Sequence, residues 1–201
     1  MAVLTSLGIP DVTGNTTTLM PKLSYRFRVT FIGDAFTATP TRNVMQVSRP
    51  SLSHDPVQID AYNSRIYLLG KHTWEPVQVV LRDDVDSIVL KEINNQMNRQ
   101  VDHALQSSVK SGSAYKFSMI VETLDGGNPN PGVLDRFEFA GCYIQTVNYG
   151  DMNYGDSNMV TTQMQIRYDN CEIYDANGRA TLTGATQDQT LVNATGGQVA
   201  D

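Results

Sequence analysis

Charged residues are scarce in this sequence, and the basic ones are scattered. Of its 201 residues, 18% are charged and 40% are hydrophobic, and the formal net charge is −6 at pH 7. The chain therefore lacks the concentrated basic patch with which many proteins hold nucleic acid. Much of its surface must consist of uncharged Thr, Ser, Asn and Gln. That composition suits an all-β protein or a chain whose surface is covered by partners.

Long apolar runs are also missing. None approaches the roughly 20 residues that a membrane-spanning helix needs, and the first 21 residues lack the basic start and apolar centre of a signal peptide. We therefore expect one domain without a membrane anchor, made in a cytoplasm. Cys142 and Cys171 are the only cysteines. They could pair, but in a reducing compartment we expect free buried thiols.

No pattern typical of catalysis or cofactor binding is present. His54, His72 and His103 stand at unrelated places, with no Cys or carboxylate at metal-ligand spacing. The letters SHD at 53–55 are those of a catalytic triad, but triads are assembled from separated positions. No glycine-rich phosphate-binding loop occurs. The sequence thus predicts a protein that is not an enzyme and has no catalytic, cofactor-binding or metal site.

Strand patterns occupy most of the chain. Residues 24–32 alternate between apolar and polar side chains, as in a half-buried strand. The turn at Gly33–Asp34 leads into a second run at 35–47, and the two runs predict a hairpin. Further strands are expected at 77–82, at 115–124, at 135–150 with a bend at Gly141, and at 159–175.

One segment has a helical period instead. Apolar residues recur every fourth position and predict an amphipathic helix over about 86–107. Asp83, Asp84 and Asp86 stand at its start, where carboxylates accept hydrogen bonds from free N–H groups and suit the helix dipole. The stripe expected to pack on the barrel core consists of Val89, Ile93, Met97, Val101 and Leu105.

The single tryptophan, Trp74, stands at the entry to the strand 77–82. One interpretation is a stacking platform for a sugar or a base. The other is a large core aromatic that closes one end of a barrel, with its indole N–H bonded to a neighbouring carbonyl. We favour the structural interpretation.

Residues 50–72 predict an extended arm made of two short strands. A lone hairpin is only marginally stable in water, so its apolar face needs another surface. Opposite charges on the two limbs would suit a repeated head-to-tail contact between copies. The residues expected to form this contact between rings are Asp55, Val57, Ile59, Asp60, Arg65, Ile66 and Leu68.

The order of these elements resembles the tail tube protein of contractile-tailed bacteriophages. The resemblance covers about residues 20–175, and its most specific part is the run LLGKHTWEPVQVVLRDD before the helix. PKLSYRFRVTFIG at the start and the closing strand that ends in EIYD also fit. The resemblance implies a mainly β fold, which is a small barrel or sandwich of antiparallel strands with one flanking α-helix and a long hairpin arm. Six-fold rings of such subunits stack into a hollow tube.

The resemblance also implies partners. These are further copies in stacked hexameric rings, the tail sheath protein, a tape-measure protein in the lumen, and the baseplate and tail-terminator proteins. DNA would pass without specific binding, and the negative net charge fits a channel that does not hold phosphates. The location implied is the virion tail tube, assembled in the host cytoplasm.

The domain organisation expected is a polar N-terminal arm at 1–22, the barrel domain at 23–175 and a polar C-terminal tail at 176–201, ordered by neighbouring subunits. Two other functions stay open. One is the tube protein of a bacterial secretion or contractile injection system, which shares the architecture. The other is a monomeric carbohydrate-binding β-sandwich that uses Trp74 and some of the nine tyrosines.

Overall fold

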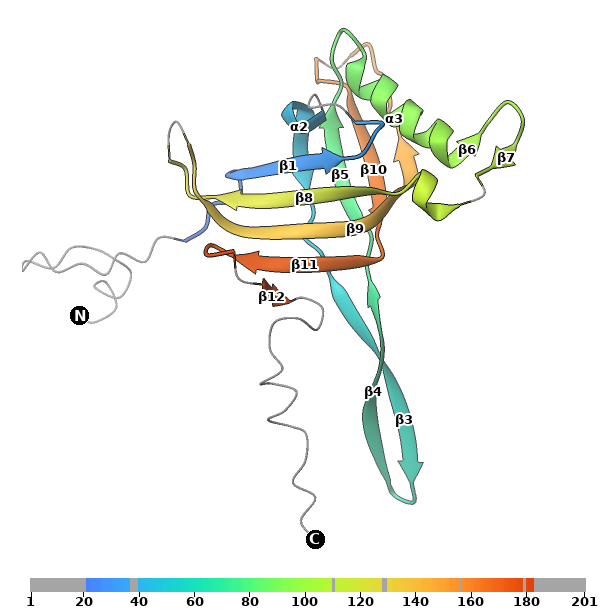
Figure 1. The fold of residues 1–201 in the computed structure, drawn as a ribbon, viewed down its shortest axis with the longest axis vertical. Coiled ribbons are helices and arrows are strands. Elements are labelled where there is room, and N and C mark those ends of the chain that lie inside the picture. Colours follow the sequence, from blue (N-terminus) through green and yellow to red (C-terminus); the bar gives the residue numbers. More distant parts are fainter. Residues whose placement is uncertain are drawn as a thin grey trace, which may run out of the picture.

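Two antiparallel sheets share one long, bent strand (Figure 1). The computed structural model describes residues 21–36, 40–109, 111–127, 130–155, 157–178 and 180–182. The shared strand is β9 (Val133–Asn148). It bends at Gly141, which has φ +69, and a Cβ at this position would lie 2.2 Å from Oδ2 of Asp169. Only glycine fits there, so the predicted bend is confirmed, as is the mainly β fold.

Each half of β9 belongs to a different sheet. The first half lies between β8 (Phe117–Leu124) and β11 (Asn170–Asp175), and this sheet is completed by β1 (Phe27–Ile32) beside β8 and β12 (Ala180–Leu182) beside β11. The second half pairs with β10 (Thr161–Arg167), followed by β5 (Val77–Arg82) and β2 (Val44–Val47). Several neighbouring strands, such as β1 and β8 or β5 and β10, come from distant parts of the sequence.

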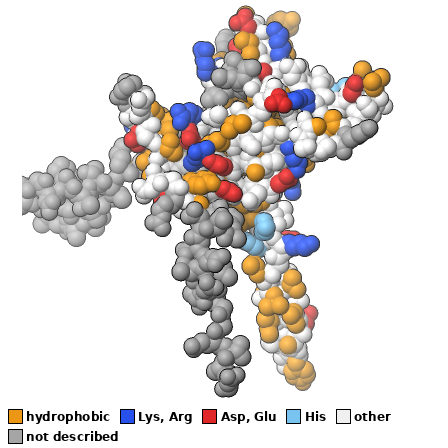
Figure 2. Space-filling model, viewed as in Figure 1, with side chains coloured by type: hydrophobic (Ala, Val, Ile, Leu, Met, Phe, Trp, Pro, Cys, Tyr) orange, Lys and Arg blue, Asp and Glu red, His pale blue; other side chains and the backbone are white. Residues whose placement is uncertain are grey.

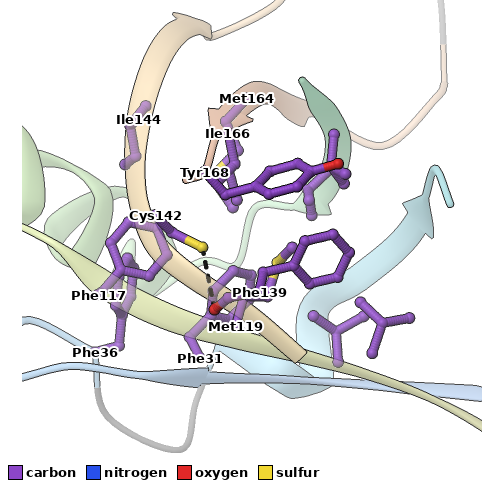
Figure 3. Packing of buried hydrophobic residues seen from close by; sticks show 14 of the residues in the cluster. Phe31, Phe36, Phe117, Met119, Phe139, Cys142, Ile144, Met164, Ile166 and Tyr168 are labelled. Carbon is purple, nitrogen blue, oxygen red and sulfur yellow. Dashed lines mark hydrogen bonds between the residues drawn. The ribbon is translucent and has the colours of Figure 1, made fainter. Parts of the chain in front are cut away.

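The core fills the space between the two sheets (Figure 3). β8 and β10 show why, because their inward residues alternate with outward ones at period two. The side chains that are least exposed to solvent include Val77, Val79, Leu81, Met119, Phe139, Ile144, Met164 and Ile166.

The hairpin predicted for residues 24–47 is wrong. β1 pairs with β8, and the chain beyond the turn crosses to the other sheet through the short helix α2 (Pro40–Asn43) and β2. Phe36 explains the crossing. Its ring packs 5.2 Å from Phe31 and 4.9 Å from Phe117 between ring centroids, which carries the chain into the core instead of back along β1.

The single strand predicted at 159–175 is two strands. β10 ends at Arg167 and β11 begins at Asn170, and each belongs to its own sheet. Tyr168 stays buried between them, and Asp169 at the break forms an ion pair with Lys116 and donates its N–H to the carbonyl of Ala140 at 3.0 Å. The corner therefore follows the bend of β9 at Gly141.

The helix is shorter than predicted. α3 (Ile88–Gln100) buries Val89 and Ile93 and half-buries Met97, but Val101 and Leu105 are 38% and 78% exposed and are not core residues. Val101 is extended and opens β6 (Val101–Asp102), which pairs with β7 (Ser107–Ser108). The side chain of Asp102 accepts hydrogen bonds from the N–H groups of residues 104 and 105 and so organises the turn between β6 and β7.

Both ends of α3 are held by polar side chains. Oδ1 of Asp84 accepts the N–H of Ile88 at 3.0 Å, so the prediction that an aspartate caps the helix is confirmed. Gln100 donates its amide to the carbonyl of Ile144 and accepts that residue's N–H, both at 2.9 Å. Gln96, fully buried, donates to the carbonyl of Tyr115 at 2.5 Å. The apolar stripe thus includes two glutamines that fasten the helix to neighbouring backbone.

Cys142 and Cys171 are free and buried, as predicted. Burial raises the pKa of each thiol from 9.0 to about 12, which leaves about a thousandfold fewer thiolates near neutral pH. We expect the native protein to react with 5,5′-dithiobis(2-nitrobenzoate) at least a hundredfold more slowly than in guanidinium chloride. Release of two equivalents of chromophore at equal rates in both solutions would contradict this burial.

Candidate assembly interface

A long hairpin projects from the second sheet (Figure 1). It consists of β3 (Leu52–Ala61) and β4 (Ser64–Trp74), which pair only with each other among the described strands. The strands continue β2 and β5 beyond the sandwich, and the chain reverses at Tyr62 and Asn63, with Tyr62 at φ 46. Hereafter "the arm" means residues 52–74. The predicted extended hairpin is confirmed.

The register of the arm divides its side chains into two faces. Cross-strand partners lie on the same face, so the pairs Val57–Leu68 and Ile59–Ile66 stand together. Figure 2 shows hydrophobic side chains along the projecting arm. These four residues are 46–54% exposed, because no segment in the described part of the chain covers them. We call Val57, Ile59, Ala61, Ile66 and Leu68 the apolar face of the arm.

The predicted charged contacts are made within the arm. Asp60 lies directly across from Arg65, and Nε of Arg65 is 3.0 Å from Oδ1 of Asp60. Gln58 donates to the same carboxylate oxygen at 2.8 Å. Exposed ion pairs contribute little stability. The main effect of the Asp60–Arg65 pair is therefore on the register between β3 and β4. Asp55 lies at a bulge, where its carbonyl oxygen would be 2.2 Å from a Cβ on Gly70. A role for these charges between copies stays a prediction.

Trp74 anchors the base of the arm. Its ring is buried 5.8 Å from that of Tyr168, which in turn packs edge-on to Phe139 at 4.8 Å. This position supports the structural interpretation, since a stacking platform must face solvent. The hydrogen bond predicted for its indole N–H is wrong, because Nε1 has no partner in the described part of the chain.

Two free strand edges flank a groove. β1 pairs only with β8, and β2 only with β5, in the sheets that the structure describes. A groove of about 890 Å³ separates them, walled by residues 22–29 and 44–49 and lined deeper by Val121 and Phe137. Free edges present unpaired N–H and C=O groups that can continue a sheet into another chain. Sequence reasoning missed these edges because it placed β1 and β2 in one hairpin.

The histidines do not form a site. His54 and His72 face each other near the base of the arm, with ring centroids 6.3 Å apart, and His103 lies in the turn after β6. Within the described ranges, no three His, Cys, Asp or Glu side chains gather as metal ligands would. In the same ranges, no helix is both long enough and apolar enough to cross a membrane.

The sequence matches no family model and no curated protein, whereas solved structures match the fold. A chain of the anti-feeding prophage cap, described as a tube-terminating cap, aligns with a TM-score of 0.62 at 13% identity over 82% of this chain and 97% of that one. A chain of the same particle's baseplate gives 0.59 at 12% over 79% and 99%. A chain of the sheath–tube complex of an extracellular contractile injection system gives 0.53 at 12% over 77% and 92%.

This protein shares its fold with chains of contractile injection systems. The predicted resemblance to the tail tube family is thereby confirmed at the level of the fold, while identities this low carry no residue-level role. The arm must be interpreted from its own chemistry. Three of its exposed side chains, Tyr62, Tyr67 and Leu69, were not predicted. Tyr67 and Leu69 alternate with Ile66 and Leu68 and lie on the opposite face of the arm, across from Gln58 and Pro56, while Tyr62 is at the tip.

Proposed function

We propose that this protein is a structural, non-enzymatic subunit that forms hexameric rings, which stack into the hollow inner tube of a contractile phage tail. The observation that carries the proposal is the arm. A two-stranded hairpin is marginal in water, yet this one exposes an apolar face along its length. If that face packs against a second copy, the exposed apolar side chains leave water and form a contact that is repeated from copy to copy. The shared fold with a tube-terminating cap and a sheath–tube complex supports the same function.

The proposed partners follow from that place in the particle. The tube would contact the sheath outside, a tape-measure protein inside, and the baseplate and tail terminator at its ends. The matching chains come from a six-fold symmetrised baseplate, a cap and a sheath–tube complex, which supports these neighbours. DNA would pass through the lumen without specific binding. The net charge of −6 supports passage, because it opposes phosphate attraction. The location is the virion tail, after assembly in the host cytoplasm.

A second candidate is the tube of a bacterial contractile injection or secretion system. It is favoured by the matching structures, which are injection particles. Particles purified from the producing cells would distinguish the two, since a phage tube is attached to a DNA-filled head and an injection tube is not.

Electron microscopy of the purified protein tests the proposal. Rings or hollow rods in negative stain, with sedimentation that increases with concentration, are the expected result. A featureless monomer at high concentration would contradict it. That outcome would favour the carbohydrate-binding sandwich, and glycan binding by the exposed tyrosines would then be the next measurement.

Replacing His54, His72 and His103 together by glutamine is expected to leave ring and tube yields nearly unchanged. The physical reason is that these side chains have no carboxylate or thiol cluster around them in the described chain. Tube yield is measured by pelleting, and hydrolase activity is assayed with added divalent metals. A metal-dependent activity that the triple variant loses would show that the protein is an enzyme.

A further inference from the structure

A second uncovered apolar surface lies at the end of the sandwich opposite the arm. β5 and β10 connect the two ends, because Val77 pairs with Ile166 near the base of the arm and Arg82 pairs with Thr161 at the far end. The connections at 83–87 and 149–160 leave from that far end, as Figure 1 shows. They lie together, since Asp83 donates its N–H to the carbonyl of Val160 at 3.1 Å.

Several apolar side chains at this end face solvent. Met152 is 86% exposed, and Val85 and Tyr154 are fully exposed. Met159 and Val160 add to the same surface. We call Val85, Met152, Tyr154, Met159 and Val160 the loop end.

The described part of this loop is organised by its own hydrogen bonds. The side chain of Asn148 accepts the N–H of Gly150 at 2.9 Å, and that of Asn153 accepts the N–H of Gly155 at 3.0 Å. Gly150 has φ +74, and a Cβ there would lie 2.8 Å from the carbonyl oxygen of Thr161. These hydrogen bonds and the positive φ of Gly150 fix the course of the backbone, and the side chains of Met152 and Tyr154 remain exposed to water. Single exposed apolar residues are ordinary, but five on two hydrogen-bonded connections at one end of the fold indicate an interaction surface.

We infer that the loop end is the surface on which a second copy seats its arm. The inference rests on the proposed tube function. The described residues form two apolar surfaces, at opposite ends of the β5–β10 axis, that no other described segment covers. A repeated head-to-tail step would join each arm to the next loop end. Such a heterologous contact does not close on itself and builds a filament. Ten residues of β3 span about 33 Å, so the arm reaches across the loop end of the next copy.

Charge does not oppose this pairing. The arm carries two exposed carboxylates, Asp55 and Asp60, and two exposed basic side chains, Arg65 and Lys71, so its formal charge is zero and it does not repel the exposed Asp86 and Asp151 beside the loop end. The groove between β1 and β2 is a less suitable acceptor, because it runs beside strand edges on the flank of the sandwich and suits lateral pairing within a ring. An axial neighbour meets the loop end.

Two variants and their mixture test the inference. The loop variant carries Met152→Asp and Tyr154→Asp, and the arm variant carries Ile59→Asp and Ile66→Asp. All four positions are exposed, so each variant is expected to keep the parent's thermal midpoint and to form no tubes. The equimolar mixture retains one working contact, the arm of the loop variant on the loop end of the arm variant. We expect paired rings from it, at twice the mass of single rings, and no tubes.

The control is Leu105→Asp, which adds a carboxylate at an apolar position that is 78% exposed and lies in the turn between β6 and β7, outside the arm and the loop end. It is expected to form tubes as the parent does. If the loop variant forms tubes, or if the mixture stays as single rings, the loop end is not the acceptor. Loss of tubes in the control as well would mean that the effect is not specific and would also overturn the inference. If the parent forms no rings or tubes, the proposed function itself fails.

Discussion

Shortening the arm is expected to give a folded protein that no longer grows into tubes. The change replaces residues 55–71 by Asn-Gly, placed between His54 and His72, which face each other across the strands. Asn-Gly forms the type I′ turn that closes a two-residue hairpin. Every replaced residue is exposed except the partly buried Gly70. The free energy of unfolding should therefore change by less than about 1 kcal/mol, or about 2–4 °C in midpoint.

Tube formation should fall below detection, because the deletion removes the whole apolar face of the arm. Pelleting and negative-stain microscopy measure it, and circular dichroism reports the midpoint. The matched comparison is Asp60→Asn with Arg65→Gln, which removes only the charged part of the predicted contact. A tube yield within about twofold of the parent would assign the stacking to the apolar face, and a larger loss would show that these charges also join copies. A shortened protein that pellets as readily as the parent would show that another segment stacks the rings.

Period and alternation carried most of the correct predictions. β5 and β8 are sandwich strands whose inward and outward residues alternate, so their positions followed from local sequence. Alternation also predicted the two strands of the arm. Because a lone hairpin has no core of its own, the apolar side chains of Val57 and Ile59 were expected to need another surface, and both are exposed. Local patterns therefore identified both the strands and the surface that they leave uncovered.

Pairing could not be obtained in this way. The turn after β1 has the residues of a hairpin, yet the ring of Phe36 favours the core, and the partner of β1 is β8, some 90 positions further along the chain. The break at Tyr168–Asp169 is equally non-local, since it depends on the bend that Gly141 gives to β9. The free edges of β1 and β2, and with them the groove, are consequences of that pairing.

Trp74 shows a different limit. Its burial at a strand end could be predicted from size and polarity alone. Its hydrogen bonding could not, because the ring packs against Tyr168 with no acceptor within the described chain near Nε1. Indole N–H groups usually find a partner when buried. This general tendency led to the wrong expectation for the hydrogen bond, although the burial of the ring was predicted correctly.

The end of α3 is the second feature with a large expected effect. Replacing Ile93 by aspartate should destabilise the protein by about 3–5 kcal/mol, because the side chain is 1% exposed and a carboxylate there would be buried without a partner. At this chain length that corresponds to a midpoint lower by about 10 °C or more. Ile93→Ala, which adds no charge, should cost about 2–5 kcal/mol by leaving a cavity, and it provides a soluble variant if the aspartate aggregates.

Leu105→Asp also places a carboxylate on the predicted stripe, about three turns further along. Because that position is 78% exposed beyond the turn at Asp102, its midpoint should stay within about 2 °C of the parent. Met97→Asp, at a half-buried position, should fall between the two. Thermal melts followed by circular dichroism rank the three. Equal losses at 93 and 105 would mean that the helix continues to about 107 and that its apolar stripe is buried along its whole length. The ranking 93, 97, 105 would place the end of the core at Gln100, where the side chain fastens α3 to the backbone of Ile144.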